Sequence, residues 1–136
     1  MQLLVQRHRN RAVYALLVVV VVCAGLASRK YAYLLPAELG KYPGDALWAM
    51  MVFFILGVLK PKWASAATGA LALSVCYLVE FSQLLQPQWL VNVRQTTLGH
   101  LALGSHFHAQ DLLAYAVGIF AGVLAELLAI PSESAA

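Results

Sequence analysis

Charged side chains and cysteines are scarce in this chain. Only 11% of its 136 residues are Asp, Glu, Lys or Arg, whereas 62% are hydrophobic; a typical globular domain has about 25% charged and about 45–50% apolar residues. The cysteines, Cys23 and Cys76, both fall inside apolar runs, so we expect neither a disulfide nor a cysteine-bound metal. No serine or cysteine stands in a recognisable nucleophile turn, and no glycine-rich phosphate loop is present. The sequence therefore identifies no catalytic residue and no cofactor, and it favours a binding protein over an enzyme.

Polar stripes at helical spacing are also missing. A soluble helical bundle needs them on the outward face of each helix, yet Leu17–Val22 and Leu47–Leu59 are apolar all round. A membrane-spanning helix requires about 20 mostly apolar residues. We therefore predict an all-α membrane protein in which residues 1–136 form a single integral membrane domain. Its four transmembrane helices are predicted at residues 12–28, 45–60, 63–86 and 111–130.

The distribution of Lys and Arg bears on topology. An even number of spans puts both termini on one side of the membrane, where five Lys and Arg residues lie against four on the other side. The positive-inside rule then favours cytoplasmic termini. The first span, preceded by Arg7, Arg9 and Arg11, also has the charge pattern of a cleavable signal peptide. The net charge of +3 suits membrane flanks, and without a basic and aromatic pattern we expect no nucleic-acid partner.

Polar and ionisable side chains gather near one end of the predicted spans. Glu80 and Gln83 lie one helical turn apart at the end of the third apolar run, and a carboxylate near lipid should face the bundle and find a cation. Arg94 is the nearest candidate, so we predict a Glu80–Arg94 ion pair. Asp45 and Asp111 stand where helices are expected to begin, and aspartate is a favoured N-cap. Capping explains each aspartate alone, but it does not explain the gathering of charges at one face.

The two loops at this end share a pattern. Arg29 is followed 16 residues later by Asp45 and an apolar helix, and Arg94 is followed 17 residues later by Asp111 and another. This echo is compatible with a parallel repeat of two helical hairpins, an arrangement that can form a site at the repeat interface. The candidate ligand-binding residues are the polar side chains at this end of the bundle: Arg29, Asp45, Glu80, Gln83, Arg94 and Asp111.

Histidines and small residues form two further patterns. His106, His108 and Asp111 make a His-x-His-x-x-Asp string, but a loop string lacks a fixed spacing and no fourth ligand is evident, so we predict no metal site. In the last span Gly118 and Gly122 are four residues apart and give the helix a smooth face. That face either packs within one chain or forms the seam of a homo-oligomer.

Several motifs resemble a known family. They are Gly25-Leu26-Ala27-Ser28-Arg29, Lys41-Tyr42-Pro43-Gly44-Asp45-Ala46-Leu47-Trp48-Ala49, Val79-Glu80-Phe81-Ser82-Gln83 and Asp111-Leu112-Leu113-Ala114-Tyr115. Over these motifs the chain resembles an uncharacterised bacterial family of small membrane proteins, DUF2809. More distantly, Glu80-x-x-Gln83 followed by Arg94 and Asp111 resembles the VanZ-like proteins, which are associated with resistance to glycopeptide antibiotics. The resemblance implies a multi-pass protein of the bacterial cytoplasmic (inner) membrane with a role that faces the cell envelope.

Three hypotheses for function follow. In the first, the protein binds an amphiphilic envelope ligand at the outer leaflet, such as a membrane lipid or a lipid-linked cell-wall precursor, or assists such a binder; Arg29 and Arg94 would meet anionic head groups. In the second, it is a membrane enzyme in which Glu80 or Asp111 acts as general acid or base. In the third, it is a small transporter or structural subunit, although transport is disfavoured because the middles of the predicted helices carry no charge.

Overall fold

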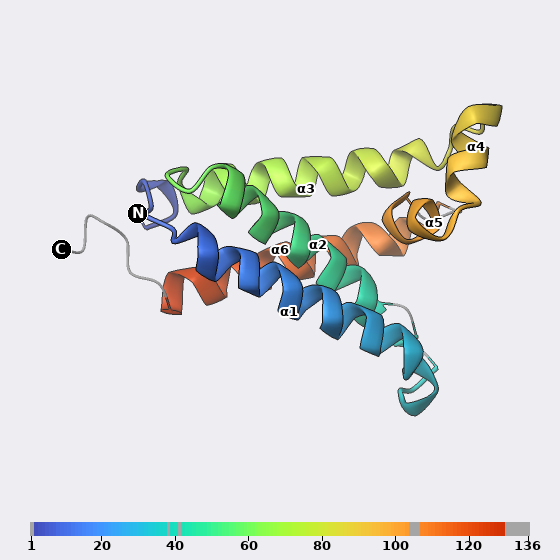
Figure 1. Ribbon diagram of the computed structural model, residues 1–136, viewed down its shortest axis with the longest axis horizontal. Helices are drawn as coiled ribbons and strands as arrows, with labels where there is room; N and C mark the ends of the chain where they lie inside the picture. Colours follow the sequence, from blue (N-terminus) through green and yellow to red (C-terminus); the bar gives the residue numbers. More distant parts are fainter. Residues whose placement is uncertain (1, 38, 41, 104–106, 130–136) are drawn as a thin grey trace.

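The computed structural model describes residues 2–37, 39–40, 42–103 and 107–129, and every regular element in these ranges is a helix (Figure 1). Four of these helices are long and apolar enough to cross a membrane: α1 (Arg11–Lys30), α2 (Tyr42–Leu59), α3 (Ser65–Ser82) and α6 (Ala109–Ala129). The prediction of an all-α membrane protein with four spans is therefore confirmed. The third span is shorter than predicted, because α3 ends at Ser82 rather than at residue 86.

The connection between α3 and α6 contains two short helices, α4 (Gln88–Arg94) and α5 (Thr97–Leu103). In Figure 1, α4 lies across the end of α3, and α5 lies between α4 and the start of α6. A β-carbon added at Gly99 would lie 1.7 Å from the carbonyl oxygen of Val93. Only glycine therefore allows α5 to fold back this closely on α4.

At the other end of the bundle, helix α1 begins with a side-chain cap. The side chain of Asn10 accepts hydrogen bonds from the backbone N–H groups of Ala12 (2.9 Å) and Val13 (3.2 Å), which satisfies two donors of the first turn of α1. Just before this cap, the backbone N–H groups of Arg7 and Arg9 donate to carbonyls of the turn between α2 and α3. The segment before α1 is thereby fixed against the α2–α3 turn.

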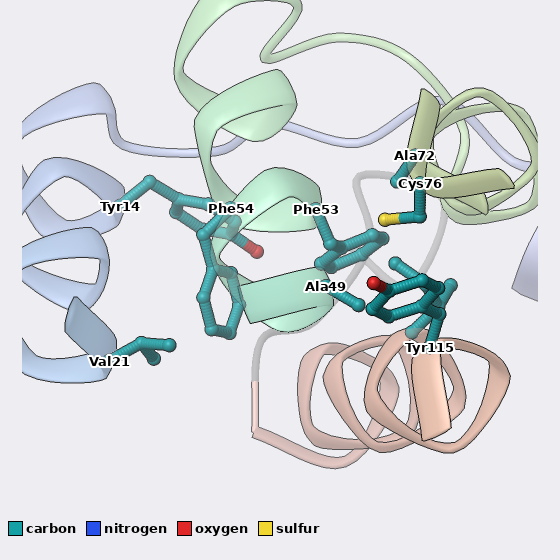
Figure 2. Close-up of a cluster of buried hydrophobic side chains, with 9 residues drawn as sticks. Tyr14, Val21, Ala49, Phe53, Phe54, Ala72, Cys76 and Tyr115 are labelled. Carbon is teal, nitrogen blue, oxygen red and sulfur yellow. The ribbon is translucent and has the colours of Figure 1, made fainter. Parts of the chain in front are cut away.

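Helix α2 is the centre of the bundle and packs against α1, α6 and α3, while α3 also packs against α6. Figure 2 shows Phe53 of α2 next to Cys76 of α3 and Tyr115 of α6, with Phe54 turned toward Tyr14 of α1. The rings of Tyr14 and Phe54 meet edge to face, 5.7 Å apart. Helix α1 buries only Tyr14 and Val21, so most of its surface is left for lipid.

The small-residue face of α6 packs against α2. A β-carbon at Gly118 would lie 2.0 Å from the carbonyl oxygen of Ala46, and one at Gly122 would lie 3.1 Å from the ring of Phe53. Of the two alternatives for this face, the structure shows close packing within one chain. A homo-oligomer through the same face stays a prediction.

Candidate functional site

Polar side chains, all of them buried except Arg29, form two clusters at opposite ends of the bundle. The loop-end cluster lies where α1 and α3 end and where α2 and α6 begin, and it consists of Arg29, Asp45, Glu80, Gln83, Arg94, Asp111 and Tyr115. The terminal-end cluster lies where α1 and α3 begin and where α6 ends, and it consists of Arg7, Arg9, Tyr14, Ser65, Thr68 and Glu126. The apolar core drawn in Figure 2 separates them.

Glu80 is the most deeply buried member of the loop-end cluster. Its side chain has no exposed surface, and its two carboxylate oxygens accept hydrogen bonds from the Tyr115 hydroxyl and from the backbone N–H of His108, both at 2.8 Å. These donors lie on α6 and just before it. Glu80 therefore joins the end of α3 to the start of α6.

Two further carboxylates lie near Tyr115. Those of Asp45 and Asp111 act electrostatically on its hydroxyl, and both residues are buried in the first turns of α2 and α6. The ring of Tyr115 also packs against Trp48, 5.5 Å away between centroids. Acidic side chains from three helices thus act on one tyrosine, and Glu80 contacts it directly.

Arg29 reaches the cluster from the last turn of α1. Its Nη2 lies 3.7 Å from Oδ1 of Asp45, and 39% of its side chain is exposed, against 12% for Asp45. A β-carbon at Gly44 would lie 3.2 Å from Nε of Arg29, so glycine at this position leaves room for the guanidinium beside α2. Arg29 is therefore a partly accessible cation with a weak internal partner.

Gln83 and Arg94 hold the loop side of the cluster together. The amide nitrogen of Gln83 donates to the carbonyl oxygen of Leu103 at 2.5 Å. Arg94 donates to the carbonyl oxygens of Leu85 (2.9 Å) and Ser82 (2.6 Å), and also to the Ser82 hydroxyl (3.2 Å). These acceptors are at the C-terminal end of α3, where a cation is favoured.

The predicted Glu80–Arg94 ion pair is wrong. Both oxygens of Glu80 are bonded to Tyr115 and His108, and the guanidinium of Arg94 donates to carbonyls of the α3 end instead. The two halves of the proposed repeat also differ in the contacts of their arginines. Arg29 lies within ion-pair distance of its aspartate, whereas Arg94 makes no corresponding contact with Asp111 within the described ranges.

The histidine string is only partly described. His106 falls outside the described residues, and His108 contributes its backbone N–H rather than its ring to Glu80. Among the residues that the structure describes, no group of three His, Cys, Asp or Glu side chains is placed to hold a metal ion.

The terminal-end cluster centres on Glu126 of α6. Its carboxylate accepts hydrogen bonds from Nε and Nη2 of Arg9 and from the hydroxyls of Tyr14 and Ser65, and Nε of Arg7 lies 3.6 Å away. Arg9 also donates to the carbonyl oxygen of Trp63 at 2.8 Å. Because Arg7 and Glu126 are each only 1% exposed, this network is inside the protein.

Sequence reasoning did not include Glu126 or the two arginines in a site. The sequence did carry a signal for Glu126, because it is a lone acid inside the apolar run 112–130. An acid in a membrane span should face the bundle and find a cation, as was argued for Glu80. Arg7 and Arg9 were interpreted as flanking charges only. A glycine completes the geometry: a β-carbon at Gly57 would lie 2.5 Å from the ring of Tyr14, so glycine lets this ring reach Glu126.

An apolar groove of about 300 Å³ lies between α1, α2 and α5. Its walls include Val22, Gly25, Leu47 and Leu98, and Arg29 and Gly44 lie at the end nearest the loop-end cluster. Of the six candidate residues, only Arg29 is among its described lining residues.

The fold and these sites define a four-span helical membrane protein with a buried ionic cluster at each end. The chain belongs to the family described as protein of unknown function (DUF2809), whose model matches residues 34–119. The matched region runs from η2 (Ala32–Leu34) to the middle of α6 and contains every loop-end cluster residue except Arg29. The chain matches no solved structure significantly.

Proposed function

We propose that the protein binds an anionic amphiphile in the groove between α1, α2 and α5. The tail would lie along the apolar walls, and the head group would meet the guanidinium of Arg29. The observation that carries this proposal is that an apolar groove ends at a partly exposed arginine.

The polar end of the groove decides selectivity. Lipid tails are as apolar as the groove walls, so moving a tail from bulk lipid into the groove changes the free energy little. The head group differs, because Arg29 presents N–H donors that match phosphate or carboxylate oxygens. At 3.7 Å, its contact with Asp45 is too long for a hydrogen bond, so donors remain for a ligand.

The other loop-end residues would position this site rather than touch the ligand. Glu80 and Gln83 fix the end of α3 to neighbouring segments, and Asp45 lies beside Arg29. The enzyme hypothesis is less well supported, because Glu80 has no exposed surface and both its oxygens accept hydrogen bonds. Transport is also less well supported, since the described core between the two clusters is apolar.

The location of the site follows from the topology that we propose. With cytoplasmic termini, the loop-end cluster and the groove would face the outer leaflet of the inner membrane of a bacterium. The distant resemblance to VanZ-like proteins favours an envelope ligand, such as a lipid-linked precursor, as an alternative to a bulk phospholipid.

Native mass spectrometry of the purified protein tests the proposal. The wild type should retain an anionic lipid that Arg29→Gln loses, whereas Lys30→Gln should retain it. Lys30 is the matched control, because it follows Arg29 in the same turn and is not among the described groove residues. Gly25→Leu, which fills the groove without changing charge, should also lose the lipid. Equal retention by all four proteins would refute the proposal.

A further inference from the structure

Arg94 is a buried cation whose observed contacts are all to uncharged acceptors. The residue is only 5% exposed, and its guanidinium donates to two carbonyls and one hydroxyl at the end of α3. Its Nε has no hydrogen-bond partner, and within the described ranges no carboxylate lies at ion-pair distance from it. The partial negative charge at the end of α3 offsets only part of this buried positive charge, so the position favours an anion.

Arg94 is one of the residues that line a basin of about 720 Å³ between the end of α3, α4 and α5. The polar side chains that line it are Gln86, Arg94, Gln95, Thr96, Thr97 and His100. None of its described lining residues is acidic. The basin thus combines one fixed positive charge with amide, hydroxyl and imidazole groups that can donate hydrogen bonds.

The turn between α4 and α5 gives the basin its shape. The hydroxyl of Thr96 accepts a hydrogen bond from the backbone N–H of Gly99 at 3.0 Å and donates to the carbonyl oxygen of Val93 at 2.7 Å. Together with the close approach at Gly99, these bonds hold α5 at a fixed angle to α4. The backbone that carries the polar side chains of the basin is therefore held in place.

We infer that this basin is a second binding site, which takes a phosphate-type anion held by Arg94, His100 and the neighbouring amides. A phosphate carries several acceptor oxygens, and such a group matches donors that converge from more than one helix. The head group of a phospholipid and a free phosphate share this chemistry. Leu101 of α5 lines both the basin and the apolar groove, so α5 separates this site from the one at Arg29.

Thermal unfolding in detergent, with inorganic phosphate compared with chloride at equal ionic strength, tests the inference. Phosphate should raise the unfolding temperature of the wild type more than chloride does. Gln95→Glu places a carboxylate in the basin at an exposed position, so it should weaken the apparent affinity for phosphate at least tenfold. Gln88→Glu makes the same change outside the described lining and should leave the affinity unchanged. His100→Gln, also at an exposed position, should weaken the apparent affinity for phosphate by a smaller factor than Gln95→Glu does.

Nanodiscs distinguish the two sources of the anion. If a lipid head group fills the basin, the stabilisation by phosphate should disappear in phosphatidylglycerol nanodiscs and persist in phosphatidylcholine nanodiscs. If a free phosphate fills it, the stabilisation should be the same in both. The inference is overturned if phosphate and chloride raise the unfolding temperature of the wild type equally. It is also overturned if Gln95→Glu and Gln88→Glu have the same apparent affinity for phosphate. Neither measurement depends on Arg29, so this inference can fail while the groove proposal stands.

Discussion

Replacing Glu126 by glutamine should destabilise the protein strongly. The substitution keeps the size of the side chain, but it removes the negative charge next to the buried guanidinium groups of Arg7 and Arg9. Removing one partner of a buried ion pair typically costs about 3–5 kcal/mol. Arg9 keeps its hydrogen bond to the carbonyl of Trp63, so we expect a loss of about 3 kcal/mol, at the lower end of that range.

Reversible unfolding in mixed micelles measures this loss as a free energy of unfolding. Arg9→Gln should also destabilise, and the double variant should lose less than the sum of the single losses because the two residues are in contact. Tyr14→Phe removes one hydrogen bond to a charged acceptor and should cost about 1.5–3 kcal/mol. The reasoning is refuted if Glu126→Gln changes the free energy by less than about 0.5 kcal/mol, the usual range for surface substitutions, or if the losses at positions 9 and 126 are additive.

Three other predictions concern packing, the loop-end cluster and topology. Gly118→Ala should lower the free energy of unfolding by about 1–3 kcal/mol, and by more than Gly122→Ala does in the same unfolding assay. The reason is that the β-carbon added at position 118 meets the backbone of Ala46, whereas the one added at position 122 meets only the ring of Phe53. A larger loss for Gly122→Ala than for Gly118→Ala would contradict this. Tyr115→Phe should cost more than Tyr77→Phe, since the Tyr115 hydroxyl donates to the Glu80 carboxylate and the Tyr77 hydroxyl donates to a neutral carbonyl; equal losses would contradict this prediction. In a chain without its native cysteines, a cysteine at Gln88 should react with an impermeant thiol reagent from outside the cell and one at Lys62 should not, and the opposite labelling would place the loop-end cluster in the cytoplasm.

The spans could be predicted from the sequence because apolar runs of sufficient length have few alternatives in a membrane. The burial of Glu80 was also predictable, since a lone carboxylate near lipid has to face protein. Its partners were not predictable. They are the Tyr115 hydroxyl and the backbone N–H of His108, and both depend on how the start of α6 meets the end of α3.

Arg94 shows the same limit. The ion pair with Glu80 was predicted from opposite charge alone. In the structure α3 ends at Ser82, and the guanidinium of Arg94 donates to carbonyl oxygens at this end. Where a helix ends is among the least certain features of a sequence-based prediction. The terminal-end cluster needed long-range information as well, because Arg9 and Glu126 are 117 residues apart in the chain.

We propose that the groove between α1, α2 and α5 holds an anionic amphiphile with its head group at Arg29. The most direct test is an experimental structure of the protein in nanodiscs that contain the lipids of its native membrane. We predict density that starts at the guanidinium of Arg29 and continues past Gly25 and Leu47 along the groove. A groove closed by repacked side chains, or lipid density that is no stronger there than around the rest of the bundle, would contradict the account.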